Sequence, residues 1–305
     1  MSGKRGTLYL VPNALDFGIA GADEAVSLDE VLPLGVLRIA ARLEHWVAEN
    51  ARSTRAFLKR VERVVPLAHA LQQIGIVELP RPPKGGHKSV AAPDLAPLLA
   101  PLLAGHDLGL ISEAGLPAVA DPGAALVQAA HAAGIEVVAL PGPSSLLLAL
   151  AASGLNGQSF AFVGYLPVEA PARTARLREL EASSRRAGQT QLMIETPYRN
   201  EALLQALAQH LQPDTRLSVA CGLTSANGWC RTQAVAAWRV PITMMCFAPG
   251  AKTSVSPAAM PGLPKGSMRA RSPVVTVSCS SALSAQVSST FCSVRGVADV
   301  LRIVP

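Results

Sequence analysis

The sequence has few aromatic residues and little charge, and it lacks the composition of a disordered chain. Phe, Trp and Tyr make up 4% of the 305 residues and charged residues make up 16%, whereas half of the residues are hydrophobic. A hydrophobic share of that size excludes disorder for most of the length. The apolar residues are mainly Ala, Leu and Val, a mixture that suits parallel sheets covered by helices.

The sequence also lacks the marks of secretion, of a membrane span and of a cysteine-based metal site. No signal-peptide core precedes the apolar residues 7–11, and the longest uncharged stretch, residues 137–157, is interrupted by Pro141, Gly142 and Pro143. The five cysteines form no CxxC pair and show no metal-ligand spacing. We therefore expect a reduced, cytoplasmic protein with no metal ion and no membrane segment.

The net charge of +6 comes almost entirely from the C-terminal part of the chain. Residues 240–305 contain six basic residues and one acid, so they carry five of the six net positive charges. The first 239 residues are nearly neutral. Their charge therefore does not by itself indicate a nucleic-acid-binding body.

Strand and helix patterns alternate along most of the chain. Continuous apolar runs at residues 7–11, 108–111 and 135–140 indicate buried strands, and helical patterns lie between them at 54–64, 95–104 and 124–133. Strands separated by helices in this way form βαβ units and a parallel sheet. We predict an α/β protein with two α/β domains: residues 1–156 with an open parallel sheet, and residues 157–239 with a mixed sheet.

The pattern changes abruptly at about residue 240. Residues 240–305 hold eleven serines and four of the six methionines, and no helical or alternating period lasts more than a few residues. Two explanations remain open for this tail: a disordered natural extension, or a shifted reading frame that begins after about Trp238. The second explanation predicts that a strand completing the second sheet is missing, which would leave an open sheet edge.

Three polar turns follow predicted strands. Residues 112–123 are rich in Gly and Pro and carry Glu113 and Asp121, which suit ribose hydroxyls or helix capping. Residues 141–145 end in Ser144 and Ser145, and residues 195–199 form a polar turn in the second domain. Ligands of open α/β sheets bind at the carboxyl ends of the strands, where such turns lie.

These turns resemble motifs of the tetrapyrrole-methylase-like superfamily of S-adenosyl-L-methionine-dependent methyltransferases, most closely the ribosomal small-subunit methyltransferase I group. Residues 112–123 are similar to the group's S-D-A-G-T-P-x-x-S-D-P-G, and residues 140–145 to its I-P-G-P-S-A. Residues 162–167 match F-x-G-F-L-P, and residues 194–199 resemble Y-E-S-P-H-R. The likeness covers about residues 6–238.

The resemblance implies an enzyme of rRNA processing that methylates a ribose 2′-oxygen of 16S rRNA as a homodimer, with RNA or the small ribosomal subunit as its partner. The cofactor S-adenosyl-L-methionine would lie in a cleft between the domains. Glu49 is implied as the base for a hydroxyl acceptor and Arg52 as a clamp for an anionic group. The implied cofactor-binding residues are Leu10, Val11, Pro12, Ser112, Glu113, Ala114, Gly115, Leu116, Pro117, Asp121, Ser144, Ser145, Glu195, Thr196 and Pro197.

Departures from the group's motifs keep two other functions open. The first loop has mostly lost its glycines, Asn50 stands where the group has a carboxylate, and the H-E-H-N block is missing. One alternative is methylation of a tetrapyrrole or another small molecule, whose carboxylates would suit the basic residues between Arg52 and Arg60. The other is a non-catalytic regulator that binds S-adenosyl-L-methionine or a nucleotide.

Overall fold

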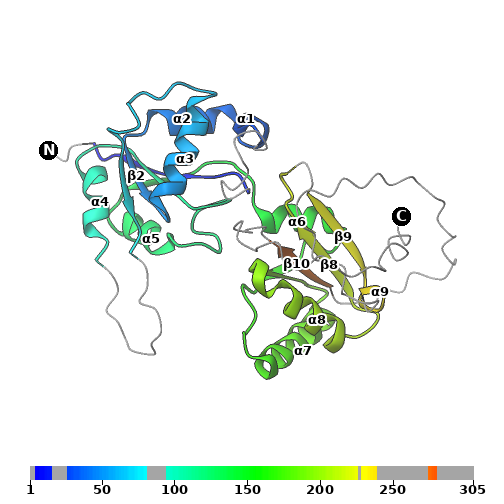
Figure 1. Cartoon of the computed structure of the whole chain (residues 1–305). Helices are drawn as coiled ribbons and strands as arrows, with labels where there is room; N and C mark the ends of the chain where they lie inside the picture. The colour runs from blue at the N-terminus through cyan, green and yellow to red at the C-terminus, as the bar shows by residue number, and fades with distance from the viewer. Residues whose placement is uncertain (1–3, 16–25, 81–93, 226–227, 239–273, 280–305) are drawn as a thin grey trace, which may run out of the picture.

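The computed structural model describes residues 4–15, 26–80, 94–225, 228–238 and 274–279. They form two five-stranded sheets with their helices, seen as two lobes in Figure 1. Both lobes combine a sheet with packed helices, which confirms the α/β class. In the described part of the chain, every helix is too short or too polar to cross a bilayer.

The first sheet has five parallel strands in the order β3-β2-β4-β1-β5. In chain order the strands are β1 (Thr7–Val11), β2 (His45–Ala48), β3 (Gly75–Glu78), β4 (Leu108–Ile111) and β5 (Glu136–Ala139). In the centre, Leu10 pairs with Leu110 of β4 and Ala139 of β5. Strand β3, for which the sequence analysis made no prediction, extends the sheet beyond β2.

Helices cover both faces of this sheet. On one face, α1 (Leu28–Val31), α2 (Leu34–Arg42) and α3 (Ala51–Glu62) bury a cluster that includes Trp46 and Phe57. On the other, α4 (Ala96–Leu103) and α5 (Ala124–Ala132) bury Leu102, Leu110 and Leu126. Two apolar faces on one sheet explain why its strands read as continuous apolar runs.

Close packing between β4 and β2 gives a stability prediction. A Cβ atom added to Gly109 would lie 2.7 Å from Cε3 of Trp46, whose ring is almost fully buried. We expect Gly109→Ala to lower the free energy of unfolding by about 1–3 kcal/mol through overpacking. Gly157→Ala is the control because a Cβ there meets nothing within 4 Å. Equal urea midpoints for the two variants would contradict the packing described here.

The second sheet has the order β6-β7-β10-β8-β9 and is mixed, as predicted, because β9 alone runs antiparallel to its neighbour. Its strands are β6 (Phe160–Phe162), β7 (Thr190–Glu195), β8 (Arg216–Cys221), β9 (Trp229–Ala234) and β10 (Val274–Cys279). Its helical segments are α6 (Ser145–Ser153), α7 (Ala170–Ala187), the short 3₁₀ turn η1 (Pro197–Arg199), α8 (Asn200–His210) and α9 (Val235–Trp238).

Helix α6 packs on the second sheet, although its residues fall in the first of the two predicted domains. Leu146 and Leu150 of α6 form a buried cluster with Leu192 of β7. On the opposite face, Leu177 of α7 and Leu203 of α8 pack with Met193. The chain therefore changes from one sheet to the other just before α6, at residues 140–144, rather than at residues 156–157.

Strand β10 lies in the middle of the second sheet, in a tail where the sequence analysis expected no regular structure. It pairs in parallel with β7 on one side and with β8 on the other. Val274, Val275, Thr276 and Val277 are all β-branched, which favours a strand. The sheet thus has no open edge between β7 and β8. The rest of the tail lies outside the described residues, and the shift in reading frame stays a prediction.

Candidate active site

The carboxyl ends of β1, β2 and β4 bring three predicted site segments together. Val11 and Ala48 both pair with Ile111 in the central strand β4. Leu10, Val11 and Pro12 therefore end beside the turn that begins at Ser112, and Glu49 lies on the other side of that turn. The main-chain N–H of Glu49 donates to the Ile111 carbonyl at 3.1 Å.

Asn13 fastens the loop after β1 to the turn after β4. Its main-chain N–H donates to the Gly115 carbonyl at 2.9 Å, and the Gly115 N–H donates back at 3.1 Å. Its side-chain amide donates to the Glu113 carbonyl at 2.9 Å, and the residue is 4% exposed. Asn13 was not among the predicted site residues, because its loop was compared with the related motif only for its lost glycines. A polar residue directly after a buried strand was the available signal.

Asn50 holds Glu113 and the start of α3 in place. The Asn50 amide Nδ2 donates to Glu113 Oε1 at 3.0 Å, while Asn50 Oδ1 caps α3 by accepting from the N–H of Arg52 at 2.9 Å. The Glu113 N–H donates to Glu49 Oε2 at 3.1 Å. An amide at position 50 can donate to the Glu113 carboxylate, which a second carboxylate could not do when ionised. The Arg52 side chain is exposed on the first turn of α3.

The turn after β4 is held in an uncommon backbone conformation. Ala118 and Ala120 have φ angles of 64° and 66°, in the left-handed region that side chains disfavour. Such conformations persist where the surrounding structure imposes them, and they cluster at ligand-binding and catalytic sites. Asp121 follows this turn and lies close enough to Glu49 and Glu113 for their negative charges to raise its pKa.

Asp121 is the most perturbed acid of this edge. Burial raises the pKa of its carboxyl, and the negative charges of Glu49 and Glu113 raise it further, to about 7. A carboxyl group with that pKa both holds and releases a proton near neutral pH. Asp121, Glu49 and Glu113 together form the carboxylate cluster of the first domain.

The second domain contributes Glu195 and Tyr165 to the same region. Glu195, at the end of β7, is buried and forms an ion pair with Arg199 at 3.0 Å. It also accepts from the N–H of Thr196 at 2.8 Å. Partial burial raises the pKa of Tyr165, and Asp121, Glu195 and Glu49 raise it further. Carboxylates of both domains thus act on one phenol, so this edge of the first sheet faces the turn after β7.

Serine hydroxyls at this edge are available for a ligand. The Ser112 Oγ atom is buried and has no hydrogen-bond partner among the described residues. Ser144 directly precedes α6, and its side chain makes no capping hydrogen bond to that helix. A Cβ atom added to Gly142 would lie 2.3 Å from Pro12 Cβ. The turn after β5 therefore lies directly against the loop after β1, and Ser145 begins the adjoining helix.

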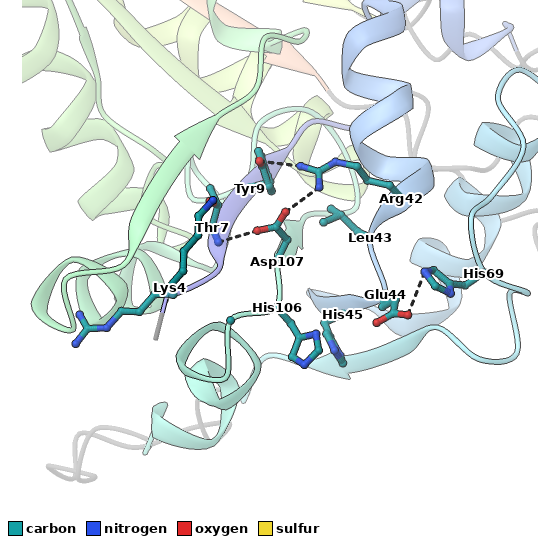
Figure 2. A pocket seen from close by; sticks show the side chains of 12 residues that line it. Lys4, Thr7, Tyr9, Arg42, Leu43, Glu44, His45, His69, His106 and Asp107 are labelled. Carbon is teal, nitrogen blue, oxygen red and sulfur yellow. Dashed lines mark hydrogen bonds and ion pairs between the residues drawn. The ribbon is translucent and has the colours of Figure 1, made fainter. Parts of the chain in front are cut away.

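A cavity of about 550 Å³ lies at the opposite edge of the first sheet. Its walls come from β1, the start of β2 and the segments that precede β1, β2, β3 and β4, and Figure 2 shows Arg42, Glu44 and Asp107 among the lining side chains. Parallel strands have all their amino ends at one edge. This cavity is therefore separate from the carboxyl-end site, and none of the predicted site residues lines it.

Comparison with known proteins gives a family match over most of the described chain. The family model "Tetrapyrrole (Corrin/Porphyrin) Methylases" matches residues 30–232. The "Ribosomal RNA small subunit methyltransferase I" of Xylella fastidiosa is 36% identical over 163 residues, which are 53% of this chain and 52% of that protein. The Streptococcus pyogenes protein of the same name is 34% identical over 195 residues, which are 64% of this chain and 57% of that protein.

The match spans about half the length of these curated relatives. Among solved structures, a uroporphyrin-III-C-methyltransferase from Thermus thermophilus is 20% identical, with a TM-score of 0.39 over 76% of this chain and 86% of that chain. A score of that size is too low to establish a shared overall arrangement.

Proposed function

Because the chain belongs to the tetrapyrrole (corrin/porphyrin) methylase family, we propose that it transfers a methyl group from S-adenosyl-L-methionine to RNA of the small ribosomal subunit. The observation that carries the proposal is the joining of the turns after β1, β4 and β5 at one edge, with the buried, unpartnered Ser112 hydroxyl among them. The names of the relatives support RNA as the acceptor, and we take the acceptor atom to be a ribose 2′-oxygen.

The residues at this edge fit the cofactor. A nucleoside offers ribose hydroxyls and an amino acid offers charged ends, and both are bound by main-chain groups, serine hydroxyls and carboxylates of the kind gathered here. The turn of residues 112–117 would hold it together with Leu10, Val11 and Pro12 from β1. Ser144, Ser145 and the turn of residues 195–197 would complete the site. When bound, S-adenosyl-L-methionine supplies an electrophilic methyl group on a sulfonium.

The chain's own part in the chemistry is to position the acceptor and take its proton. A hydroxyl acceptor needs a base whose pKa lies near the working pH. Glu49 is one candidate, and Asp121 is the other because burial and its two acidic neighbours raise its pKa to about 7. The exposed guanidinium of Arg52 suits an RNA phosphate. We further propose a cytoplasmic homodimer, for which light scattering should give about twice the chain mass of 31.7 kDa.

Labelled-methyl transfer tests the proposal. The purified chain would be incubated with methyl-labelled S-adenosyl-L-methionine and with small ribosomal subunits from a strain that lacks the chain. We expect label in the RNA, at a ribose, and none in subunits from the parent strain, whose site is already methylated. Label in a small-molecule fraction of a cell extract, with none in RNA, would favour a tetrapyrrole-type acceptor. Cofactor binding without any methyl transfer would favour the non-catalytic regulator.

A further inference from the structure

Two histidines and a glutamate meet at the amino-end edge of the first sheet. Each of Glu44, His45 and His106 offers a ligand atom, and these atoms all lie within 4.8 Å of one another. The three side chains border the cavity, where Figure 2 shows His45 and His106 next to each other and Glu44 turned toward His69. They belong to no part of the carboxyl-end site.

The fold fixes the positions of these residues. Strands β2 and β4 are neighbours, and His45 pairs with Leu108, so His106 lies just before the point of pairing. The His106 N–H donates to the Pro101 carbonyl at 2.9 Å. Gly6 lies so close to the His106 main chain that a Cβ atom there would be 1.8 Å from its carbonyl oxygen. The two ligand-bearing segments are therefore held side by side by the sheet.

The chemistry of the three groups matches a known ligand set. Two imidazoles and one carboxylate bind zinc and similar divalent transition ions, leaving a further position for water. Imidazole ligands disfavour magnesium and calcium, which prefer oxygen.

His69, which is not one of the three ligands, orients the Glu44 carboxylate. His69 Nε2 lies 3.0 Å from Glu44 Oε1, as expected of an outer partner that holds a metal ligand in place. The His45 and His106 rings meet edge to face, with centroids 5.2 Å apart.

Several basic side chains line the cavity and would repel a bound cation, but two of them are already paired with other groups. Arg42 is paired with Asp107 at 2.8 Å and also donates to the Tyr9 hydroxyl. The Arg5 guanidinium donates to the Ala133 carbonyl. Two of the cationic side chains that border the cavity thus already have hydrogen-bond or ion-pair partners.

We propose that Glu44, His45 and His106 bind one divalent transition-metal ion, with zinc as the first candidate. His69 is the positioning residue for the Glu44 carboxylate. The ion would connect the amino ends of β2 and β4 and would lie at the wall of the cavity. The cysteine spacing predicted no metal ion. The sequence gives no sign that residues 44 and 45 lie near residue 106, because only the pairing of β2 with β4 brings them together.

Zinc binding by the tag-free chain tests this proposal without any use of methyl transfer. We expect one zinc ion per chain in equilibrium dialysis, with affinity greatly reduced in both His45→Gln and His106→Gln. His69→Gln should weaken binding by roughly 10–100-fold, the usual effect of losing an outer partner. His131→Gln and His210→Gln, on α5 and α8, are matched controls that should bind as the wild type does.

Cobalt substitution provides a second readout on the unmodified chain. A Co²⁺ spectrum with d–d bands and no thiolate charge-transfer band is expected for nitrogen and oxygen ligands. A thiolate band would overturn the assignment because it would place the ion at cysteines. The proposal also fails if the wild type binds no zinc at micromolar concentration, or if His45→Gln and His106→Gln bind it as tightly as the controls.

Discussion

Replacing Asp121 with Asn is expected to slow methyl transfer by about 10²–10⁴-fold, the usual contribution of a general base. The substitution keeps the size of the side chain but removes its ability to accept a proton. Asp121 is the acid of the site whose pKa, about 7, is suited to exchange a proton at neutral pH. The measurement is the initial rate of label transfer to small-subunit RNA at saturating cofactor.

The pH dependence of the rate distinguishes Asp121 from Glu49 as the base. If Asp121 accepts the proton, the wild-type rate rises with pH and reaches half its plateau near pH 7. Glu49→Gln removes one of the negative charges that raise the Asp121 pKa, so its midpoint should move to lower pH while a measurable rate remains. A rate lost in Glu49→Gln and kept in Asp121→Asn would assign the proton to Glu49 instead.

The same carboxyl affects stability in a defined direction. The folded pKa of Asp121 is raised from 3.8 to about 7, so between these values the folded chain binds more protons than the unfolded chain. Its contribution to the free energy of unfolding therefore falls as the pH rises from about 4 to 7. Asp121→Asn should remove this slope. Asp214→Asn, an exposed acid paired with Arg185, is the control for both the rate and the slope.

Proline at position 277 is expected to disrupt the second sheet. Val277 lies in β10 and pairs with Met193 of β7 and Val219 of β8. Proline lacks the N–H that a central strand donates, and it is excluded from such strands. We expect Val277→Pro to cost about 3 kcal/mol or more, comparable to a proline in a helix interior. Hydrogen exchange should show lost protection in β7 and β8, with β1 and β4 as an internal reference.

Val277→Thr is the matched variant, because threonine keeps the β-branched shape and the main-chain N–H. It should leave the protection of β7 and β8 close to the wild-type level. Unchanged protection in Val277→Pro would mean that residues 274–279 do not form the central strand. That result would favour the view that the tail after residue 240 is foreign to the domain.

The sequence predicted the fold class well because its signals are local. Apolar runs at β1, β4 and β5, separated by helices, are enough to indicate a parallel sheet. Strand β3 was not predicted, because it is short and largely exposed and its sequence, Gly-Ile-Val-Glu, is not a continuous apolar run. Strand β10 was not predicted, because its short run of β-branched residues lies within a serine-rich tail that has no other regular pattern. The partner of α6 could not be predicted, since an apolar helix packs equally well on either of two sheets.

The loops that form the candidate site could be predicted from the sequence, but the hydrogen bonds and charge interactions between those loops could not. The loops after β1, β4 and β5 follow from the rule that ligands bind at the carboxyl ends of strands. The hydrogen bonds of Asn13 and Asn50 depend on loops that lie about 100 and 63 residues away in the chain. The pKa of Asp121 likewise depends on burial and on two acids from other segments. Such effects arise only when the segments are assembled.

The change of sheet at residues 140–144 makes the linker between the lobes a part of the candidate site. Gly142 is pressed against Pro12 of the first lobe, and Ser144 and Ser145 lead directly into a helix that belongs to the second. A ligand held by these serines would therefore bind at the segment that joins the two sheets, and it would depend on the packing of both lobes. A substitution that loosens α6 on the second sheet should then weaken binding at the edge of the first sheet, although the two positions belong to different lobes.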